Sequence, residues 1–333
     1  MEKQLQTAYV LDLGNGFTKR SMDSKTIKTE PSIIGKHKEG FQIESDLDVV
    51  NVNNQREIYI GNDVWDADVP AMVALEDGEI NRVKTQEFSE LLLGFISKDF
   101  QQKSVEKITL PLLVLGLPNT EYEEHKDFLE KEFKGIFGVK MNGRSRAIEI
   151  KAVKVIPQPV GTILYSMSSK LLNGKTSLII DGGFGTIDLT ELNGKQIGES
   201  YGADLGMRKP LVQIEKYIRQ KYRNVKNLNP HMVSDILQNG LVQAGKTHSI
   251  NNDDRVVEIL SDHFREVYSY LIERFDFRDY DQVIWTGGMA LAHNEAIKHK
   301  DQFGNFVVLD ENGQEANVRG YSEYGKVVLG SGK

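Results

Sequence analysis

The stretch TAYVLDLGNGFTKRSM, residues 7–22, carries an apolar run directly into a carboxylate and a glycine-rich turn. Residues 8–13 are apolar on both faces apart from Asp12, which is typical of a central strand covered by helices on both sides. The residues after the turn continue in short alternation, so we expect a hairpin there rather than a helix. The question is which ligand needs a carboxylate at the end of such a strand.

The turn itself, Gly14-Asn15-Gly16, has the chemistry of a phosphate site. Glycines let a ligand approach the backbone closely, their N–H groups can surround anionic oxygens, and a nearby carboxylate suits a Mg²⁺-linked phosphate. Lys19, just beyond the turn, could then reach the same phosphates. Taken alone, the motif is explained about equally well by an ordinary hairpin with a solvated Asp turn.

A second stretch, SLIIDGGFGTIDLTELNGK at 177–195, repeats this design. Its spaced glycines resemble a dinucleotide-binding loop, but such a loop must open a helix, and TIDLTEL predicts a strand instead. Two strands that end on Asp, each followed by a glycine hairpin, can clamp a triphosphate from both sides. Coincidence is then the less favoured explanation. The residues of this second motif are Asp181, Gly182, Gly183, Gly185 and Thr186.

Length and composition narrow the class of protein. A chain of 333 residues is too long for one ordinary core and predicts two domains. The formal net charge of −7 argues against a chain-wide nucleic-acid surface, and the absence of cysteine excludes disulfides and thiolate chemistry. The longest apolar run, residues 110–118, is far shorter than the roughly 20 residues that span a bilayer. We therefore expect a cytoplasmic protein with no membrane contact and no direct contact with nucleic acid.

In the first half of the chain, the hydrophobic pattern predicts strands and two helices. Residues 23–85 mix short strand patterns with turn chemistry, as an inserted subdomain would. One amphipathic helix is expected from residue 86, and a second over 120–136 with Ile136 on its buried face. The segment ITLPLLVLGLP, 108–118, predicts one buried strand.

The second half repeats the opening device and adds a third glycine pair. Helices are expected over 204–222 and 254–276, followed by a strand at 281–286. Gly287 and Gly288 come directly after that strand, where a base or sugar could approach the backbone, although a tight strand-to-helix turn is an equally good explanation. The two halves indicate an internal duplication with a cleft between them.

One motif has the residue spacing of a P-loop but not its structural context. GLVQAGKT, residues 240–247, has the P-loop spacing, but a true P-loop follows a buried strand and begins a helix. Here a helix pattern precedes the motif and a polar loop follows it, so Lys246 is not expected to bind phosphate, and Gly245 is expected to end a helix. The seven histidines show no metal-ligand spacing and are interpreted as solvated or structural.

Five signals in this order resemble the actin, sugar-kinase and Hsp70 superfamily. They are DLGNG, IPQPVG, IIDGGFGTID, WTGGMALAHNEAIK and ANVRGYSEYG. Within the superfamily the chain looks most like the bacterial plasmid-segregation actins of the ParM type, which share its length, the LGLP strand before an acidic helix, and an N-x-x-G helix like the one at Asn317 to Gly320.

The resemblance implies an α/β fold of two related actin-like (ribonuclease H-like) domains with a nucleotide cleft between them, each with a smaller inserted subdomain. Domain I would comprise 1–162 plus 316–333, with its insert at about 23–85. Domain II would comprise 163–315, with its insert at about 204–265. The first insert matches the family only loosely.

The resemblance also assigns roles to residues. Asp12 would hold Mg²⁺ through water, and Asp181 would order the Mg²⁺ shell or the attacking water. Gln158 falls where the family places its water-positioning residue; ParM itself carries a glutamate there, and eukaryotic actin a glutamine. The remaining residues expected to bind ATP are Gly14, Asn15, Gly16, Lys19, Gly182, Gly183, Gly185, Thr186, Gly287 and Gly288.

The function implied is that of an ATP-dependent filament that moves plasmid DNA during segregation, with hydrolysis controlling disassembly. The cofactors would be ATP, with GTP as the alternative nucleotide, and Mg²⁺. The partners would be further copies of the chain and a DNA-binding adaptor protein. A non-polymerising ATPase or small-molecule kinase of the same superfamily is the competing hypothesis; an Hsp70-like chaperone would need a further substrate domain.

Overall fold

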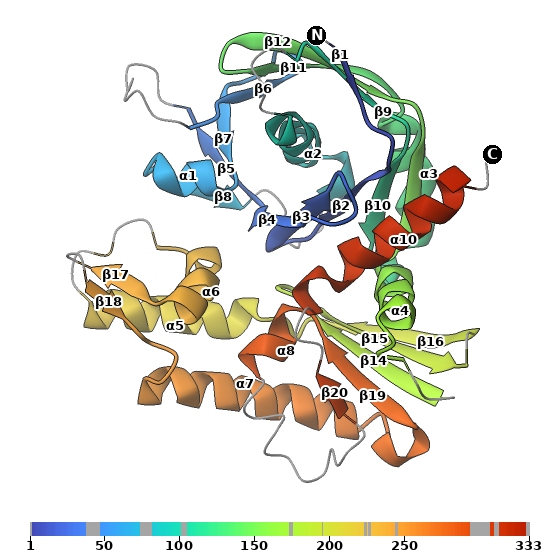
Figure 1. The fold of residues 1–333 in the computed structure, drawn as a ribbon. Coiled ribbons are helices and arrows are strands. Elements are labelled where there is room, and N and C mark those ends of the chain that lie inside the picture. Colours follow the sequence, from blue (N-terminus) through green and yellow to red (C-terminus); the bar gives the residue numbers. More distant parts are fainter. Residues whose placement is uncertain are drawn as a thin grey trace. The chain divides into compact units, whose positions relative to one another are not determined.

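The structure, a computed structural model, describes residues 2–37, 47–73, 82–100, 105–172, 176–194, 196–222, 225, 228–243, 246–293, 307–309 and 313–330. The chain forms two compact units. Unit 1 comprises Met1–Tyr165 and Asn317–Lys333, and unit 2 comprises Ser166–Ala316. Each unit combines β-sheets with helices (Figure 1).

The central sheet of unit 1 contains the strand that carries Asp12. Its order is β13-β10-β2-β3-β4; β10 runs parallel to β2 and β13, whereas β3 is antiparallel to β2 and β4. The hairpin expected after β2 is therefore confirmed. Every residue of β2 and β10 is buried, as strands covered on both faces require. The strands are β2 (Tyr9–Leu13), β3 (Phe17–Ser21), β4 (Lys28–Pro31), β10 (Leu113–Leu117) and β13 (Val153–Pro157).

A second sheet of unit 1 has the order β1-β9-β12-β11-β6-β7-β5-β8. The chain passes between the two sheets at short corners, one of them at Pro111, so the single strand predicted over 108–118 is wrong: it is two strands in different sheets. Proline lacks the N–H that a continuous ladder needs. The strands are β1 (Glu2–Gln4), β5 (Ile33–Lys36), β6 (Val50–Val52), β7 (Ile58–Ile60), β8 (Ala71–Val73), β9 (Lys107–Leu110), β11 (Gly135–Met141) and β12 (Arg144–Ile150).

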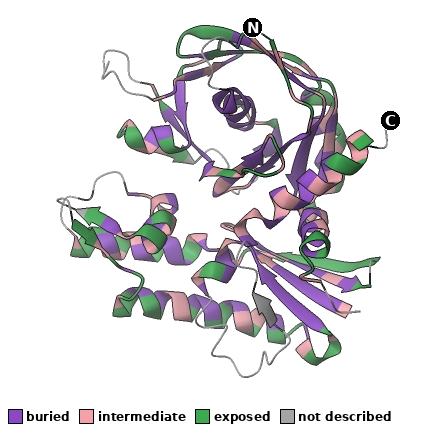
Figure 2. Cartoon of the chain, viewed as in Figure 1, coloured by how far each residue is buried: buried purple, intermediate pink, exposed green. Residues whose placement is uncertain are grey.

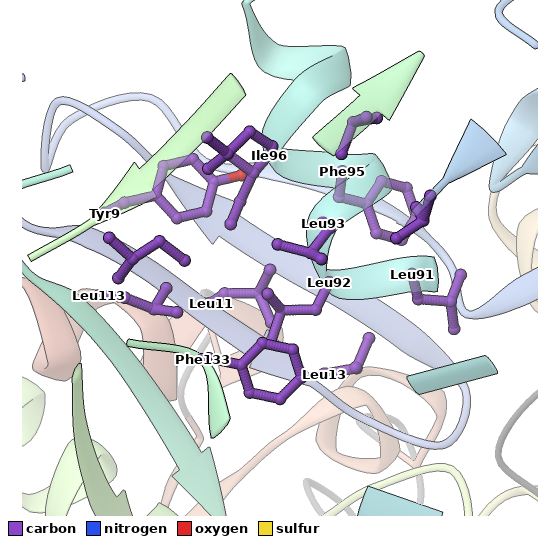
Figure 3. Packing of buried hydrophobic residues seen from close by; sticks show 14 of the residues in the cluster. Tyr9, Leu11, Leu13, Leu91, Leu92, Leu93, Phe95, Ile96, Leu113 and Phe133 are labelled. Carbon is purple, nitrogen blue, oxygen red and sulfur yellow. The ribbon is translucent and has the colours of Figure 1, made fainter. Parts of the chain in front are cut away.

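Helix α2 (Gln86–Asp99) begins where the sequence predicted and is surrounded by strands of unit 1 (Figure 1). The Thr85 hydroxyl caps it by accepting the Phe88 N–H. All residues from Glu90 to Asp99 are buried (Figure 2), and the leucines of α2 pack against β2 and β10 (Figure 3). The other helices that begin or end in unit 1 are α1 (Asn62–Asp66), η1 (Arg82–Lys84), α3 (Asn119–Glu132), α4 (Gln158–Ser168) and α10 (Ala316–Gly330).

Helix α3 is shorter than the sequence predicted. It ends at Glu132, and Ile136, which was expected to be buried on the helix, lies in β11 with 68 % of its surface exposed. The chain turns into β11 at Gly135, whose φ of +149° is open to glycine but not to most residues. Leu129 and Phe133 are buried.

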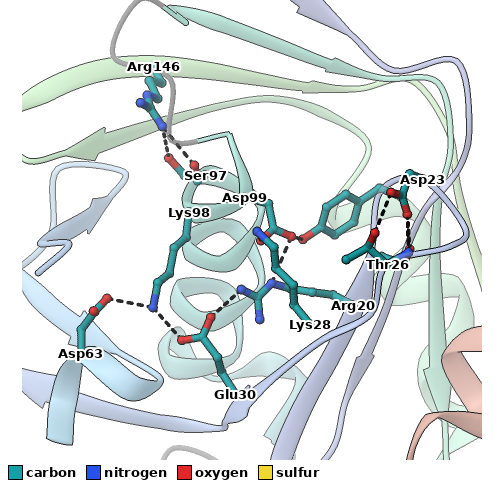
Figure 4. A network of polar contacts seen from close by, with 12 residues as sticks. Arg20, Asp23, Thr26, Lys28, Glu30, Asp63, Ser97, Lys98, Asp99 and Arg146 are labelled. Carbon is teal, nitrogen blue, oxygen red and sulfur yellow. Dashed lines mark hydrogen bonds and ion pairs between the residues drawn. The ribbon is translucent and has the colours of Figure 1, made fainter. Parts of the chain in front are cut away.

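Buried charges tie α2 to the strands around it (Figure 4). Arg20 of β3 bonds Glu30 at 2.6 Å and Asp99 at 3.1 Å. Lys98 lies 2.6 Å from Glu30 and 2.8 Å from Asp63. We call these five residues the α2 ion network. Its charges nearly balance, which is the condition under which buried ions are tolerated.

Helix α10 packs into unit 1 by very close backbone contact with α4. A Cβ on Gly320 would lie 1.8 Å from the Gly161 carbonyl oxygen. The Asn317 amide oxygen accepts the Thr162 hydroxyl at 2.6 Å. Val318 is fully buried in the same cluster as residues of β2 and β10, so a segment that follows unit 2 in the sequence completes the core of unit 1.

Unit 2 is built on one five-stranded sheet of order β16-β15-β14-β19-β20. Long helix α7 begins where the sequence predicted and buries an apolar stripe that includes Val256, Phe264 and Leu271. The strands are β14 (Thr176–Gly182), β15 (Ile187–Asn193), β16 (Gln196–Ala203), β19 (Gln282–Thr286) and β20 (Val307–Leu309). The helices are α5 (Arg208–Lys221), α6 (Pro230–Asn239), α7 (Asp254–Ile272), η2 (Phe277–Asp279), α8 (Gly288–Ala292) and η4 (Gly313–Glu315).

The P-loop-like segment has neither the strand before it nor the helix after it. Helix α6 ends at Asn239 with Gly240 as its C-cap, and a two-stranded ribbon follows, β17 (Leu241–Gln243) and β18 (Lys246–His248). Lys246 is exposed on β18. Gly245, where a helix end was expected, lies outside the described residues, and the helix instead has its C-cap five residues earlier.

Across the described ranges, no helix is both long enough and apolar enough to cross a membrane.

Candidate functional site

One group of predicted site residues lies at the carboxyl end of β2 in unit 1. Asp12 is 1 % exposed, and the hairpin register places Lys19 directly opposite it. The Lys19 ammonium lies 3.3 Å from Asp12 Oδ2. Gln158, at the start of α4, donates from Nε2 to Asp12 Oδ1 at 3.0 Å. Three residues predicted for the site are thus in direct contact, although 146 positions separate Asp12 from Gln158.

Ser32, which the sequence analysis did not identify, holds the glycine turn after Asp12 in place. The Ser32 hydroxyl donates to the Gly14 carbonyl at 2.6 Å, and the Ser32 N–H donates to the Gly16 carbonyl at 2.9 Å. The Ser32 hydroxyl also bonds the Thr18 hydroxyl at 2.9 Å. The carbonyls of Gly14 and Gly16 are therefore already bonded. Since Ser32 follows the loop by 16 residues with no spacing rule, the sequence carried no signal for it.

A second residue that the sequence did not single out contacts this turn. The Arg82 Nη1 donates to Asn15 Oδ1 at 2.5 Å and lies 3.4 Å from the Leu13 carbonyl. Its Nε donates to Glu121 at 3.1 Å. Arg82 falls within 23–85, which the sequence indicated only as a loosely matching insert.

A second group of predicted site residues lies in unit 2, at the end of β14. Asp181 pairs in register with Asp188 of β15 and Thr286 of β19. A Cβ on Gly287 would lie 2.5 Å from Asp181 Oδ1, and Gly287 has a φ of +82°, so both space and backbone conformation require glycine. A Cβ on Gly182 would lie 2.4 Å from the Met289 Cβ. Asp181, Gly182 and Gly287 are thus brought together.

The glycine loop after β14 is fixed by the segment that begins α5. The N–H groups of Gly206, Met207 and Arg208 donate to the carbonyls of Gly185, Gly183 and Phe184, at 3.0, 3.1 and 2.7 Å. Within the loop, the Gly183 N–H donates to the Thr186 carbonyl at 2.9 Å. The carbonyls of residues 183–186 are therefore bonded, as are those of Gly14 and Gly16 in the first loop.

Gly288 differs from the other site glycines. It opens α8, and a Cβ there would meet only open space. Protein packing does not require glycine at this position, which leaves the backbone accessible to a ligand.

Several histidines are more deeply buried than expected. His263 Nδ1 lies 3.2 Å from His293 Nε2, and these two side chains are buried. Burial lowers the pKa of His263. Burial, and to a smaller extent the neighbouring His263 ring, lowers the pKa of His293 to about 3. His231 is buried and stacks on Phe184 at 4.5 Å. These histidines are structural, which is one of the two alternatives that the sequence left open for them.

The donor set fits Mg²⁺ in one particular way. The described residues contain no group of three or more Asp, Glu or His side chains placed to hold a metal. Mg²⁺ commonly keeps several waters and binds through one or two carboxylates plus substrate phosphates. Asp12 in unit 1 and Asp181 in unit 2 each provide one such carboxylate beside a glycine loop, and therefore fit a Mg²⁺ that arrives with a nucleotide.

The fold is that of the actin-like proteins. Residues 11–161 match the family model described as the N-terminal domain of actin-like proteins. The predicted α/β fold class and the resemblance to the actin superfamily, of the ParM type, are confirmed. No curated protein sequence matches the chain.

Solved structures of actin-like proteins match nearly the whole chain. Apo psk41 ParM is 21 % identical, with a TM-score of 0.69 over 98 % of this chain and 99 % of that one. A ParM from a 15-stranded filament of Clostridium botulinum is 20 % identical, with a TM-score of 0.72 over 97 % and 100 %. The archaeal actin homologue Ta0583, in complex with ADP, is 15 % identical, with a TM-score of 0.73 over 97 % and 100 %. At these identities the likeness establishes the fold.

Proposed function

We propose that this chain binds ATP and Mg²⁺ and, in that state, assembles into filaments that move plasmid DNA during segregation, with hydrolysis controlling disassembly. The observation that carries the proposal is the contact of Asp12 with Gln158 and Lys19, beside a glycine loop in which the carbonyls of both glycines are already bonded. This arrangement offers a carboxylate, an ammonium and backbone N–H groups, which is the chemistry that a Mg²⁺–phosphate needs.

Each loop has a proposed role. The glycine loops at 14–16 and 182–186, with Lys19, bind phosphate oxygens, and Gly287 and Gly288 accommodate the adenosine. Asp12 and Asp181 hold Mg²⁺ through water; when bound, Mg²⁺ would neutralise charge on the transferred phosphoryl group. GTP is the alternative nucleotide. We further propose that units 1 and 2 represent the two actin-like domains, with inserts at about 23–85 and 204–265.

Gln158 is proposed to orient the attacking water. A carboxylate can only accept, so the Gln158 amide must turn its NH₂ toward Asp12, and its Oε1 is left as the acceptor for a water O–H. An amide is not a general base at neutral pH, so catalysis would rest on positioning and charge stabilisation. Slow hydrolysis by the monomer is the expected consequence.

The assembly part of the proposal is supported by the fold and by the neighbours. One neighbour is a filament of ParM, and another, from the pCBH plasmid protein, is a non-polymerisable ParM mutant. Head-to-tail contacts whose rotation does not close generate an open helix, as a filament requires. The net charge of −7 favours DNA contact through an adaptor protein rather than directly. Such a filament would act in the cytoplasm.

The test combines 90° light scattering with phosphate release on one sample after addition of Mg-ATP. We expect scattering to rise before phosphate is released, filaments in electron micrographs, and a loss of turnover of about 100-fold or more in Asp181→Ala. Lys246→Ala, on the exposed β18 strand, is the matched control and should behave as wild type.

Other outcomes would redirect the proposal. Steady phosphate release with flat scattering at tens of micromolar protein would leave the nucleotide site standing and make the chain a non-polymerising ATPase or small-molecule kinase. Loss of turnover in Lys246→Ala with normal turnover in Asp181→Ala would move the nucleotide to the P-loop-like segment.

A further inference from the structure

We propose that Arg82 is a positioning residue for phosphate binding: its guanidinium fixes the side-chain amide of Asn15 so that the amide nitrogen is presented as a hydrogen-bond donor. This inference rests on the proposed function, because it assumes that the first glycine loop binds a nucleotide. The loop's own spacing gave no sign of Arg82, which lies 67 residues from Asn15.

The chemistry of the contact determines which way the amide faces. An asparagine side chain has one acceptor end and one donor end, whereas a guanidinium has only donors. Because Arg82 Nη1 lies 2.5 Å from Asn15 Oδ1, the acceptor end is occupied by Arg82 and the NH₂ end is directed elsewhere. Phosphate oxygens are acceptors, so a loop that binds them needs the donor end. Without Arg82, the Asn15 amide would lose the contact that fixes which end carries the oxygen and which the nitrogen.

The guanidinium is itself held in place by an ion pair and by burial. Its Nε donates to Glu121, in the first turn of α3, and the side chain of Arg82 is only 9 % exposed. Glu121 balances the charge of Arg82, so the pair contributes orientation more than net positive charge. A planar fork that bonds Asn15 from one nitrogen and Glu121 from another cannot be reproduced by the single nitrogen of lysine.

The backbone of Arg82 is equally well fixed. The Thr85 N–H and hydroxyl both donate to the Arg82 carbonyl, at 3.1 and 2.7 Å, and the same hydroxyl caps α2. Arg82, on the turn η1, is therefore bonded to the residue that caps α2, the helix in which all residues from Glu90 to Asp99 are buried. A side chain that starts from so rigid an element can hold its target within the small tolerance that binding sites need.

The experiment is a double-mutant cycle on nucleotide affinity, measured by isothermal titration of the full chain with Mg-ATP. Arg82→Lys keeps the charge and loses the fork, and we expect its affinity to fall about 10-fold, the effect of one misplaced hydrogen bond. Asn15→Ala should cost a similar factor. The double variant should be no weaker than Asn15→Ala alone, because Arg82 acts through Asn15.

Lys84→Ala is the matched control, since Lys84 lies on the same turn η1 and contacts Phe128 rather than the glycine loop. It should bind ATP as wild type does. Urea unfolding of each variant tests whether the loss is structural. If Arg82→Lys does not fold, Glu121→Ala replaces it in the cycle, because it removes the other support of the guanidinium.

The outcomes separate two failures. If the wild type binds Mg-ATP and Arg82→Lys binds equally well, or if the two losses multiply in the double variant, the role of Arg82 is refuted while the nucleotide site stands. If the wild type binds no nucleotide, the proposed function itself is refuted, and this inference with it.

Discussion

At the scale of single residues, the two adjacent glycines after β19 differ in what they require. Gly287 has a φ of +82°, and a Cβ on it would lie 2.3 Å from the Gly182 carbonyl oxygen, whereas Gly288 has open space around it. The fold requires glycine at position 287 and does not require it at position 288. Substituting each in turn therefore separates packing from ligand contact.

We predict that Gly287→Ala lowers the free energy of unfolding by about 1–3 kcal/mol, the cost of a backbone conformation that alanine resists. Gly288→Ala should leave stability unchanged or slightly higher, because alanine is the better helix former at the start of α8. Urea unfolding followed by circular dichroism measures both. Equal stability of the two variants would contradict the structural role of Gly287.

At the same scale, the candidate site could be predicted where the chemistry is local. Asp12, the glycine turn and Lys19 lie within one hairpin, so the antiparallel register alone brings Lys19 opposite Asp12. Ser32 and Arg82 could not be predicted, because each reaches the turn from a segment whose distance along the sequence follows no rule. The proposed roles of the residues on the site stay predictions.

At the scale of elements, the α2 ion network holds β3, β4, α1 and α2 together, and its carboxylates respond oppositely to pH. Burial raises the pKa of Glu30, but Arg20 and Lys98 outweigh it and hold that pKa below its usual value. Burial dominates at Asp63 and raises its pKa. Glu30 therefore stabilises the fold above its unfolded pKa of about 4.3 and loses this contribution as the pH falls. For Asp63 the sign is reversed, and its charge costs stability near neutral pH.

We predict that Glu30→Gln lowers the free energy of unfolding at pH 7 by about 3–5 kcal/mol, since two buried cations lose their shared carboxylate. The difference from wild type should shrink as the pH falls below about 4. Asp63→Asn should change stability by roughly 1 kcal/mol or less. Urea titrations at several pH values test this pair; a larger loss in Asp63→Asn would show that the signs are misassigned.

Elements were predicted best where one hydrophobic period runs without interruption. Helices α2 and α7 begin where the pattern placed them, at Gln86 and Asp254. The pattern failed where the chain moves from one sheet to another, because apolar residues continue through the corner at Pro111 while their hydrogen-bonding partners change. Which sheet a strand joins depends on contacts with distant segments, which hydrophobicity alone does not specify.

At the scale of the whole molecule, the units differ in continuity. Unit 2 is one uninterrupted segment with its own core, whereas unit 1 needs α10, whose Val318 and Tyr321 are fully buried among residues of β2 and β10. An apolar core whose helix is missing leaves a large cavity and exposed apolar surface.

We predict that residues 166–316 expressed alone unfold cooperatively in urea, with circular dichroism of a folded α/β unit. Residues 1–165 alone should unfold at a lower urea midpoint or without a cooperative transition. Adding a peptide that covers 316–333 should restore the cooperative transition. A fully stable 1–165 fragment, unaffected by the peptide, would show that α10 contributes little to that core.

The position of α10 in the sequence also bears on the order of events on the ribosome. All of α10 beyond its first residue, Ala316, is synthesised after the whole of unit 2. During translation the second unit can therefore reach its native state while the first, although made earlier, still waits for its last helix. Asp12 and Gln158 belong to unit 1, so their surroundings would be complete only near the end of synthesis of the chain.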